Sequence, residues 1–197
     1  ERVVLVGVQT DDHDNVEESL DELKELASTA GAVTVGRIIQ NRESVHPGTY
    51  IGKGKIEEVR ALVYAMDATG IICDDELSPA QLNNLERELD CKVMDRTLLI
   101  LDIFAARAIT SEGQIQVELA QLRYRSARLV GLRESLSRLG GGIGTRGPGE
   151  KKLETDRRLI RNRIAALKQE LSQVEKHREL IRSRRAVGNL KTAAIVG

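Results

Sequence analysis

Residues 137–156 of the chain read SRLGGGIGTRGPGEKKLETD. Glycine dominates the first half of this stretch, and one arginine and two lysines lie among or just after the glycines. Such residues do not supply the large apolar side chains of a core. Long segments with apolar residues at helical spacing flank the stretch on both sides, so we expect residues 140–149 to form a loop at the tip of a helical hairpin. A basic loop with few side chains suits close approach to another backbone or to phosphates.

The two flanking segments have the apolar spacing of paired helices. Before the loop, apolar residues three, four or seven positions apart are Ile115, Leu119, Leu122, Leu129, Leu132, Leu136 and Leu139. After the loop, the same spacing continues at Leu153, Ile160, Ile164, Leu167, Leu171, Val174 and Ile181. Ser111 with Gln114 resembles a capping box that opens the first helix. Residues 107–187 are therefore predicted to form an antiparallel coiled-coil hairpin, which stands out from the rest of the chain because its apolar stripes are narrow.

Residues 1–106 alternate short β-branched runs with helical patterns. Strands are expected at 3–8, 33–40, 71–73 and 92–94, with helices between them and an apolar helix at 98–106. Asp14 with Glu17 resembles a capping box before the first helix, and Ser78-Pro79-Ala80-Gln81 opens the third. The connections are long enough for crossovers, so the sequence predicts an α/β domain with a small parallel sheet of about four strands and covering helices. The pattern leaves the strand order open.

Charge divides the chain in the same place. Residues 1–106 contain 10 Lys and Arg against 21 Asp and Glu, a balance of −11. Residues 107–185 contain 19 Lys and Arg against 9 Asp and Glu, a balance of +10. An acidic body with a basic arm is typical of a protein with a polyanionic partner. The basic residues on the two arm helices near the loop are Arg123, Arg125, Arg128, Arg133, Arg138, Arg157, Arg158, Arg161 and Arg163.

Composition excludes several kinds of protein and site. Aromatic residues make up 2% of the chain and tryptophan is absent, which argues against base stacking as the binding mode. No apolar run is long enough to span a bilayer, and no secretory signal pattern opens the sequence, so we expect a cytoplasmic protein. Cys73 and Cys91 are expected to be reduced core residues. The three histidines share no metal-ligand spacing, and no catalytic residue or metal site is predicted.

Residues 142–147 match the pattern GxGxxG, yet they follow a helix, whereas a dinucleotide-binding loop follows a strand. A phosphate-contacting loop is favoured over a flexible linker, because a spacer does not need Ile143, Pro148 and the basic residues. A dinucleotide-binding loop is the least favoured of the three interpretations. Candidate contacts from side chains are Arg146, Lys151, Lys152, Arg157 and Arg158. Glycines that allow close backbone approach are Gly140, Gly141, Gly142, Gly144, Gly147 and Gly149.

A second glycine-rich segment, GTYIGKGK at residues 48–55, precedes a helix and partly resembles a P-loop. Its lysines are misplaced for GxxxxGK[ST], and no serine or threonine follows them. A tight turn entering a helix is the favoured interpretation. Weak binding of a nucleotide phosphate, such as that of ATP, stays open at the start of this helix. The residues involved would be Gly52, Lys53, Gly54 and Lys55.

The runs GQIQVELAQLRYRSARLVG and SRLGGGIGTRGPGEKKLETDRRLIRNRI closely resemble the HflX family of ribosome-associated GTPases. YIGKGKIEEV and MDRTLLILDIFAARAITSEG are similar to the N-terminal region of that family. The resemblance implies that the glycine loop reaches RNA of the large ribosomal subunit and that some members split stalled ribosomes. It also implies that residues 188–197 begin a GTP-binding domain. GTP and Mg²⁺ would bind in the rest of that domain, so this chain needs no cofactor and should not hydrolyse GTP.

Three hypotheses follow from the sequence. The first is the ribosome-binding portion of an HflX-type GTPase involved in ribosome splitting or rescue. The second is a nucleotide-dependent activity of the N-terminal domain, with ATP bound weakly. The third is a hairpin that serves as a protein–protein interaction arm, with arginines that are only solvated.

Overall fold

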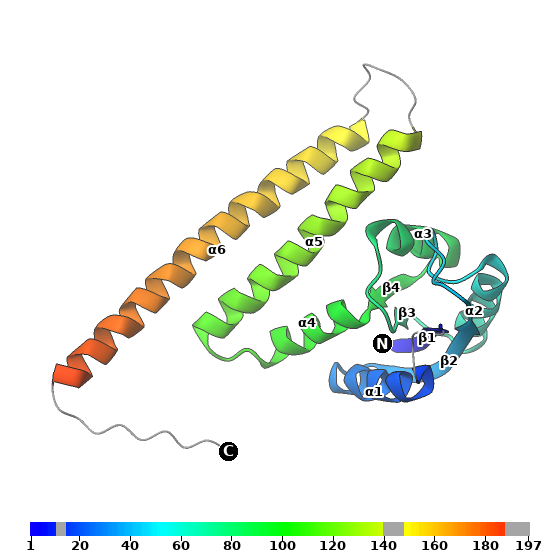
Figure 1. Cartoon of the computed structure of the whole chain (residues 1–197), viewed down its shortest axis with the longest axis horizontal. Helices are drawn as coiled ribbons and strands as arrows, with labels where there is room; N and C mark the ends of the chain where they lie inside the picture. The colour runs from blue at the N-terminus through cyan, green and yellow to red at the C-terminus, as the bar shows by residue number, and fades with distance from the viewer. Residues whose placement is uncertain (11–14, 140–147, 188–197) are drawn as a thin grey trace.

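Four parallel strands form one sheet in the order β2-β1-β3-β4 (Figure 1). The structure is a computed structural model that describes residues 1–10, 15–139 and 148–187, with side chains described for 1–10, 15–129 and 154–185. The strands are β1 (Arg2–Gln9), β2 (Val33–Asn41), β3 (Gly70–Cys73) and β4 (Lys92–Asp95). The predicted four-stranded parallel sheet is confirmed, and each strand extends one or two residues beyond its predicted ends.

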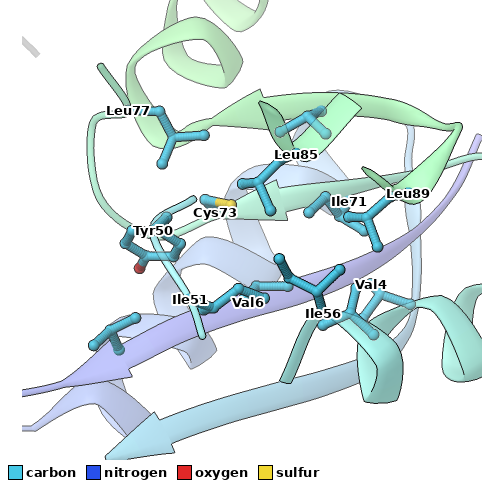
Figure 2. Close-up of a cluster of buried hydrophobic side chains, with 13 residues drawn as sticks. Val4, Val6, Tyr50, Ile51, Ile56, Ile71, Cys73, Leu77, Leu85 and Leu89 are labelled. Carbon is cyan, nitrogen blue, oxygen red and sulfur yellow. The ribbon is translucent and has the colours of Figure 1, made fainter. Parts of the chain in front are cut away.

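The central strand β1 is buried because it has a neighbouring strand on each side and helices over both faces. Its valines at 4, 6 and 8 face one core cluster, together with residues of helices α2 (Lys53–Ala65) and α3 (Pro79–Leu89). Figure 2 shows Val4 and Val6 beside Ile56 of α2 and the α3 leucines 85 and 89. Val3 and Leu5 face the opposite cluster under α1 (Val16–Thr29) and α4 (Arg96–Arg107). Burial on both faces explains the unbroken apolar run of this strand.

The helix starts agree only in part with the predicted caps. Ser78 and Gln81 form the predicted capping box of α3, with Pro79 at the first helical position. The cap of α1 is Asn15 in place of the predicted Asp14, since the Asn15 side chain accepts a hydrogen bond from the Glu18 N–H. Asp14 itself lies outside the described residues. Several acids and amides precede this helix and could cap it. Val16 is buried, and the residue directly before it, Asn15, is the cap.

Helices α5 (Ser111–Leu139) and α6 (Pro148–Val187) lie side by side and form the arm (Figure 1). Their directions are opposite, because Glu112 pairs with Arg178 while Glu118, further along α5, pairs with the earlier Arg163. Ile115, Leu119 and Leu167 are buried between them. At about 1.5 Å per residue, the 40 residues of α6 extend about 60 Å. Knob-into-hole packing of a coiled coil stays a prediction.

Two details of the arm differ from the expectation. Thr110 caps α5 in place of Ser111, since its hydroxyl accepts a hydrogen bond from the Gly113 N–H at 3.1 Å. The predicted loop 140–149 is shorter, because α6 already begins at Pro148, a residue whose fixed φ and missing N–H suit a first helical position. Residues 188–197, predicted to begin a further domain, lie outside the described residues.

Cys73 and Cys91 are free thiols, as expected, and Cys73 is buried in the sheet. Across the described parts of the chain, no helix combines the length and the apolar character that crossing a bilayer requires.

The close approach of β3 and β4 predicts the effect of an added methyl group. A Cβ atom on Gly70 would lie 2.6 Å from the backbone oxygen of Lys92, in the neighbouring strand. Gly70→Ala should therefore lower the free energy of unfolding by roughly 1–3 kcal/mol, the usual effect of overpacking. The control is Gly54→Ala in the first turn of α2, where a Cβ meets no atom within 4 Å.

Gly54→Ala should leave stability unchanged or raise it by up to about 1 kcal/mol, since alanine is the better helix former. Urea unfolding followed by circular dichroism measures both variants. A Gly70→Ala protein that unfolds at the wild-type midpoint would show that the two strands do not approach as closely as the structure has them.

Candidate nucleic-acid interface

The predicted RNA-contacting residues are divided between described and undescribed parts of the chain. Gly140, Gly141, Gly142, Gly144, Arg146 and Gly147 lie outside the described residues. Gly149, Lys151 and Lys152 belong to the first turn of α6, where only the backbone is described. Arg158, nearly two turns further along α6, is exposed, and Arg157 is half-buried. The last turn of α5 and the first turn of α6 lie close together at one end of the arm, which is its tip (Figure 1).

Several exposed arginines of the arm remain available to a partner. Arg123 and Arg125 on α5 and Arg161 on α6 are exposed. Within the described part of the chain, these three and the pair at 157 and 158 have no acidic side chain within ion-pair distance. Unpaired guanidinium groups are suited to phosphate oxygens, which they bind with two parallel N–H donors.

Two arginines assigned to the charged tip have internal roles. Arg163 makes a two-pronged ion pair with Glu118, at 2.7 and 2.9 Å, and so connects α6 to α5 across the arm. Arg128 is mostly buried and donates a hydrogen bond to Asp95, 2.6 Å away. Arg128, counted above among the basic residues near the loop, therefore serves an internal contact. Sequence spacing places Arg128 on α5 but does not show that this turn of α5 packs against the sheet domain.

Asp95 is the centre of the junction between the arm and the sheet domain. Its carboxylate is fully buried at the carboxyl end of β4. It accepts hydrogen bonds from the Leu77 N–H at 3.1 Å and from the Leu98 N–H at 2.9 Å, the latter as the cap of α4. From α5 it accepts hydrogen bonds from the Tyr124 hydroxyl and the Arg128 guanidinium. A buried carboxylate is tolerable only with such partners, so this group requires α5 to stay in place.

Tyr124 and Arg128 also contact each other. The guanidinium carbon lies 4.1 Å from the centre of the Tyr124 ring, within the range of a cation–π contact. Arg128 also donates a hydrogen bond to the Tyr124 oxygen. Burial, together with the bond to Asp95, raises the pKa of the Tyr124 phenol above its ordinary value. The phenol therefore stays protonated at neutral pH and donates a hydrogen bond to the Asp95 carboxylate.

A second buried acid holds the neighbouring strand end. Asp74 follows β3 and accepts hydrogen bonds from Arg96 at 2.8 and 3.2 Å, while Arg96 also donates to the Ser19 backbone oxygen of α1. The acids at the carboxyl ends of the strands therefore hold helices in place. No group of three or more His, Cys, Asp or Glu residues suited to a metal ion occurs among the described side chains.

The second glycine-rich segment forms a turn tied to α3. Gln81 donates to the His46 backbone oxygen at 2.9 Å, and Asn84 donates to that of Gly48 at 2.7 Å. Tyr50 is buried with a left-handed φ of 66° and donates to Asp75 at 2.8 Å. These contacts favour the interpretation of this segment as a structural turn.

Of the four candidate phosphate-binding residues in that segment, two are already engaged. The Gly52 N–H donates to the Gln40 side chain at 2.9 Å, and the Lys55 ammonium pairs with Glu58 at 2.6 Å. Lys53 and Gly54 are exposed at the start of α2. A phosphate role for these residues stays a prediction.

Comparison with known proteins agrees with this architecture. A family profile described as "GTP-binding GTPase N-terminal" matches residues 17–105, and one described as "GTP-binding GTPase Middle Region" matches residues 107–185. The boundary between them falls in the last turn of α4, just before the sheet domain gives way to the arm. GTPase HflX of Lacrimispora saccharolytica is 69% identical over 197 residues, which are all of this chain and 47% of that protein. The chain belongs to the HflX family.

A second HflX relative, from Caldanaerobacter subterraneus subsp. tengcongensis, is 55% identical over the whole chain and 46% of its own length. The chain thus spans about half the length of the curated relatives it matches. The fold also resembles a crystal structure of a GTP-binding protein from Sulfolobus solfataricus in complex with GDP, with a TM-score of 0.61 over 89% of this chain and 46% of that one. At 21% identity, this likeness concerns the fold alone.

The Asp95 junction was missed by the sequence analysis, although a signal was present. Tyr124 and Arg128 are four residues apart and share one face of α5, while Asp95 follows directly after a buried strand. This face lies opposite the apolar stripe of Ile115, Leu119 and Leu122 that packs against α6, so an aromatic residue and an arginine there favour a partner on an element other than α6.

Removing the Tyr124 hydroxyl tests the junction. Tyr124→Phe retains the ring under Arg128 but leaves the Asp95 carboxylate one donor short, so the free energy of unfolding at pH 7 should fall by about 1–3 kcal/mol. The control is Tyr64→Phe, because Tyr64 is 89% exposed; it should change stability by less than about 0.5 kcal/mol.

The pH dependence of this effect has a fixed sign. A phenol whose pKa is raised by folding contributes stability that is fully present below its unfolded pKa of about 10 and is lost as the pH rises towards the folded value. The wild type should therefore lose stability above pH 10 more steeply than Tyr124→Phe does. Equal slopes for the two proteins in urea titrations between pH 9 and 11 would contradict the buried, hydrogen-bonded position of this phenol.

Proposed function

We propose that this chain is the ribosome-binding part of an HflX-type GTPase and that the tip of its arm contacts RNA of the large subunit. The observation that carries the proposal is the distribution of paired and unpaired arginines on the arm. Arg163 and Arg128 are neutralised by Glu118 and Asp95, whereas other exposed arginines of the arm have no acidic partner among the described residues: Arg123, Arg125, Arg158 and Arg161. Exposed guanidinium groups without acidic partners, on an arm whose residues 107–185 balance to +10, favour a polyanionic partner over a face that is only solvated.

The sheet domain supports this function mechanically. Its two buried acids hold α4 and α5 against the strand ends, so the arm has a fixed base from which to project. Contacts to phosphates then fix the position of the arm on the RNA without reading base sequence. Glycines at the tip allow the backbone to approach closely where side chains would collide.

We propose that the GTP-binding domain, with its Mg²⁺, corresponds to the half of the HflX relatives' length that this chain does not span. In that arrangement, GTP binding and hydrolysis would act on a ribosome to which this chain is already bound, in a cytoplasmic process of ribosome splitting or rescue. No contact in the described structure favours the two alternatives over this proposal, namely ATP binding by the sheet domain and a protein-docking arm. The Gln40 and Glu58 contacts at the start of α2 argue against the first alternative.

Cosedimentation with isolated ribosomal subunits tests the proposal. The chain should pellet with large subunits, and log K should fall linearly with log salt, with a slope of about −0.7 to −0.9 for each neutralised phosphate. The tip variant Arg146→Ala, Lys151→Ala, Lys152→Ala should weaken binding and make the slope less steep by about two to three.

A matched control removes the same charge elsewhere. Lys24, Arg107 and Lys168 are exposed on α1, α4 and the middle of α6, so replacing all three with alanine should leave the slope unchanged. Equal binding by wild type and tip variant would sink the assignment. Binding that heparin does not compete at moderate salt would favour a protein-docking arm instead.

A further inference from the structure

The end of α6 remote from the tip extends past the start of α5. Glu112, in the first turn of α5, pairs with Arg178, so residues 179–187 of α6 continue beyond their partner helix (Figure 1). At about 1.5 Å per residue, this overhang is about 13 Å long. Leu180 on the overhang is 58% exposed, which agrees with the absence of a covering helix in the described part of the chain.

The overhang and the turn before it carry a second concentration of positive charge. Residues 176–185 contain five Lys and Arg and one Glu, a balance of +4. Residues 162–175, in the middle of α6, contain two of each sign and balance to zero. The basal patch is defined by four exposed residues for which the described structure has no ion pair: Lys176, Arg182, Arg184 and Arg185.

The helix geometry shows why this charge is unpaired. Arg178, Arg182 and Arg185 recur at i, i+4 and i+7, so they form one row along α6. Arg178 is neutralised by an acid of α5. Arg182 and Arg185 continue the same row where α5 has ended, and they meet no acid among the described residues. Among the described residues, the row thus changes from an internal contact to a basic surface without acidic partners at the base of the arm.

The helix dipole accounts for only part of the patch. Arg184 and Arg185 lie in the last turn of α6, where positive charge is favourable by about 0.3–1 kcal/mol. That effect falls off within the last turn, so it does not explain Lys176 and Arg182. Ordinary solvation does not explain the patch either, because a solvated helix face mixes both signs, as the middle of α6 does.

We infer that the basal patch is a second contact surface for an RNA backbone, separate from the tip; this inference rests on the proposed function. Arg158 near the tip and Arg182 in the patch are 24 residues apart on one helix, a separation of about 36 Å. A short single strand does not bridge two such points while leaving the neutral middle untouched. A large folded RNA does, and two contacts on one continuous helix fix the direction of the arm as well as the position of its tip.

The test measures cosedimentation of the full chain with large subunits over a salt series. It compares the tip variant with a basal variant and a control variant, each of which also loses three positive charges. The basal variant is Arg182→Gln, Arg184→Gln, Arg185→Gln, in which glutamine retains helix propensity. Its slope of log K against log salt should become less steep by about two to three. The control variant Lys24→Gln, Arg107→Gln, Lys168→Gln should match the wild type. A further variant, Arg182→Lys, Arg184→Lys, Arg185→Lys, retains the charge and should bind as the wild type does.

Each outcome separates the two proposals. A basal variant that binds with the control's affinity and slope, while the tip variant is impaired, overturns the basal patch and leaves the proposed function intact. A wild type that does not bind large subunits at all overturns both. Binding to phosphatidylserine vesicles that is lost in the basal variant, with subunit binding unchanged, overturns the RNA assignment in favour of an anionic membrane.

Discussion

The buried carboxylate of Asp95 is the interaction on which the arrangement of this molecule depends. It lies at the carboxyl end of β4 and accepts hydrogen bonds from the backbone before α3, from the start of α4 and from two side chains of α5. A charge removed from water in this way is unfavourable unless every partner is present, and removing one partner of such a pair typically costs about 3–5 kcal/mol. Asp95 therefore couples the sheet domain to the arm, and a hydrogen bond from Gln121 of α5 to Asp102 of α4 adds a second, exposed link. Arg96 and Asp74 form a similar link one strand away, between the end of β3, α4 and α1.

This constraint separates the arginines of the arm by role. Arg128 serves the junction and Arg163 holds the two helices together, and each is neutralised by an acid. On α6, the other exposed arginines lie towards the tip and in the basal patch, on either side of a neutral middle section. An arm with a fixed base and open charge at both ends is suited to a partner that is extended, negatively charged and rigid. The membership of the chain in the HflX family is consistent with a ribosomal partner, which is the proposal made above.

The sequence predicted the architecture well where one physical signal dominated. Unbroken β-branched runs identified the buried strands, and the apolar spacing on either side of the glycines identified the two arm helices, because burial is what these patterns report. Caps were predicted less well at Asp14 and Ser111, since several neighbouring residues are able to cap and the packing of the first turn selects one of them. The role of Arg128 was not predictable from composition. A charged residue on a helix reads as solvated until the element opposite it is known, and Asp95 is 33 residues away in the chain.

The central claim is that the Asp95 junction holds the arm in one orientation on the sheet domain. Pulsed electron paramagnetic resonance between nitroxide labels at Lys24→Cys on α1 and Lys168→Cys on α6, in a Cys91→Ser background, measures this directly, because both positions are exposed and the remaining thiol, Cys73, is buried. The intact junction predicts a single narrow distance distribution, which broadens when Arg128→Gln removes the charged partner of Asp95. A broad distribution with the junction intact, or one that Arg128→Gln leaves unchanged, would contradict the claim.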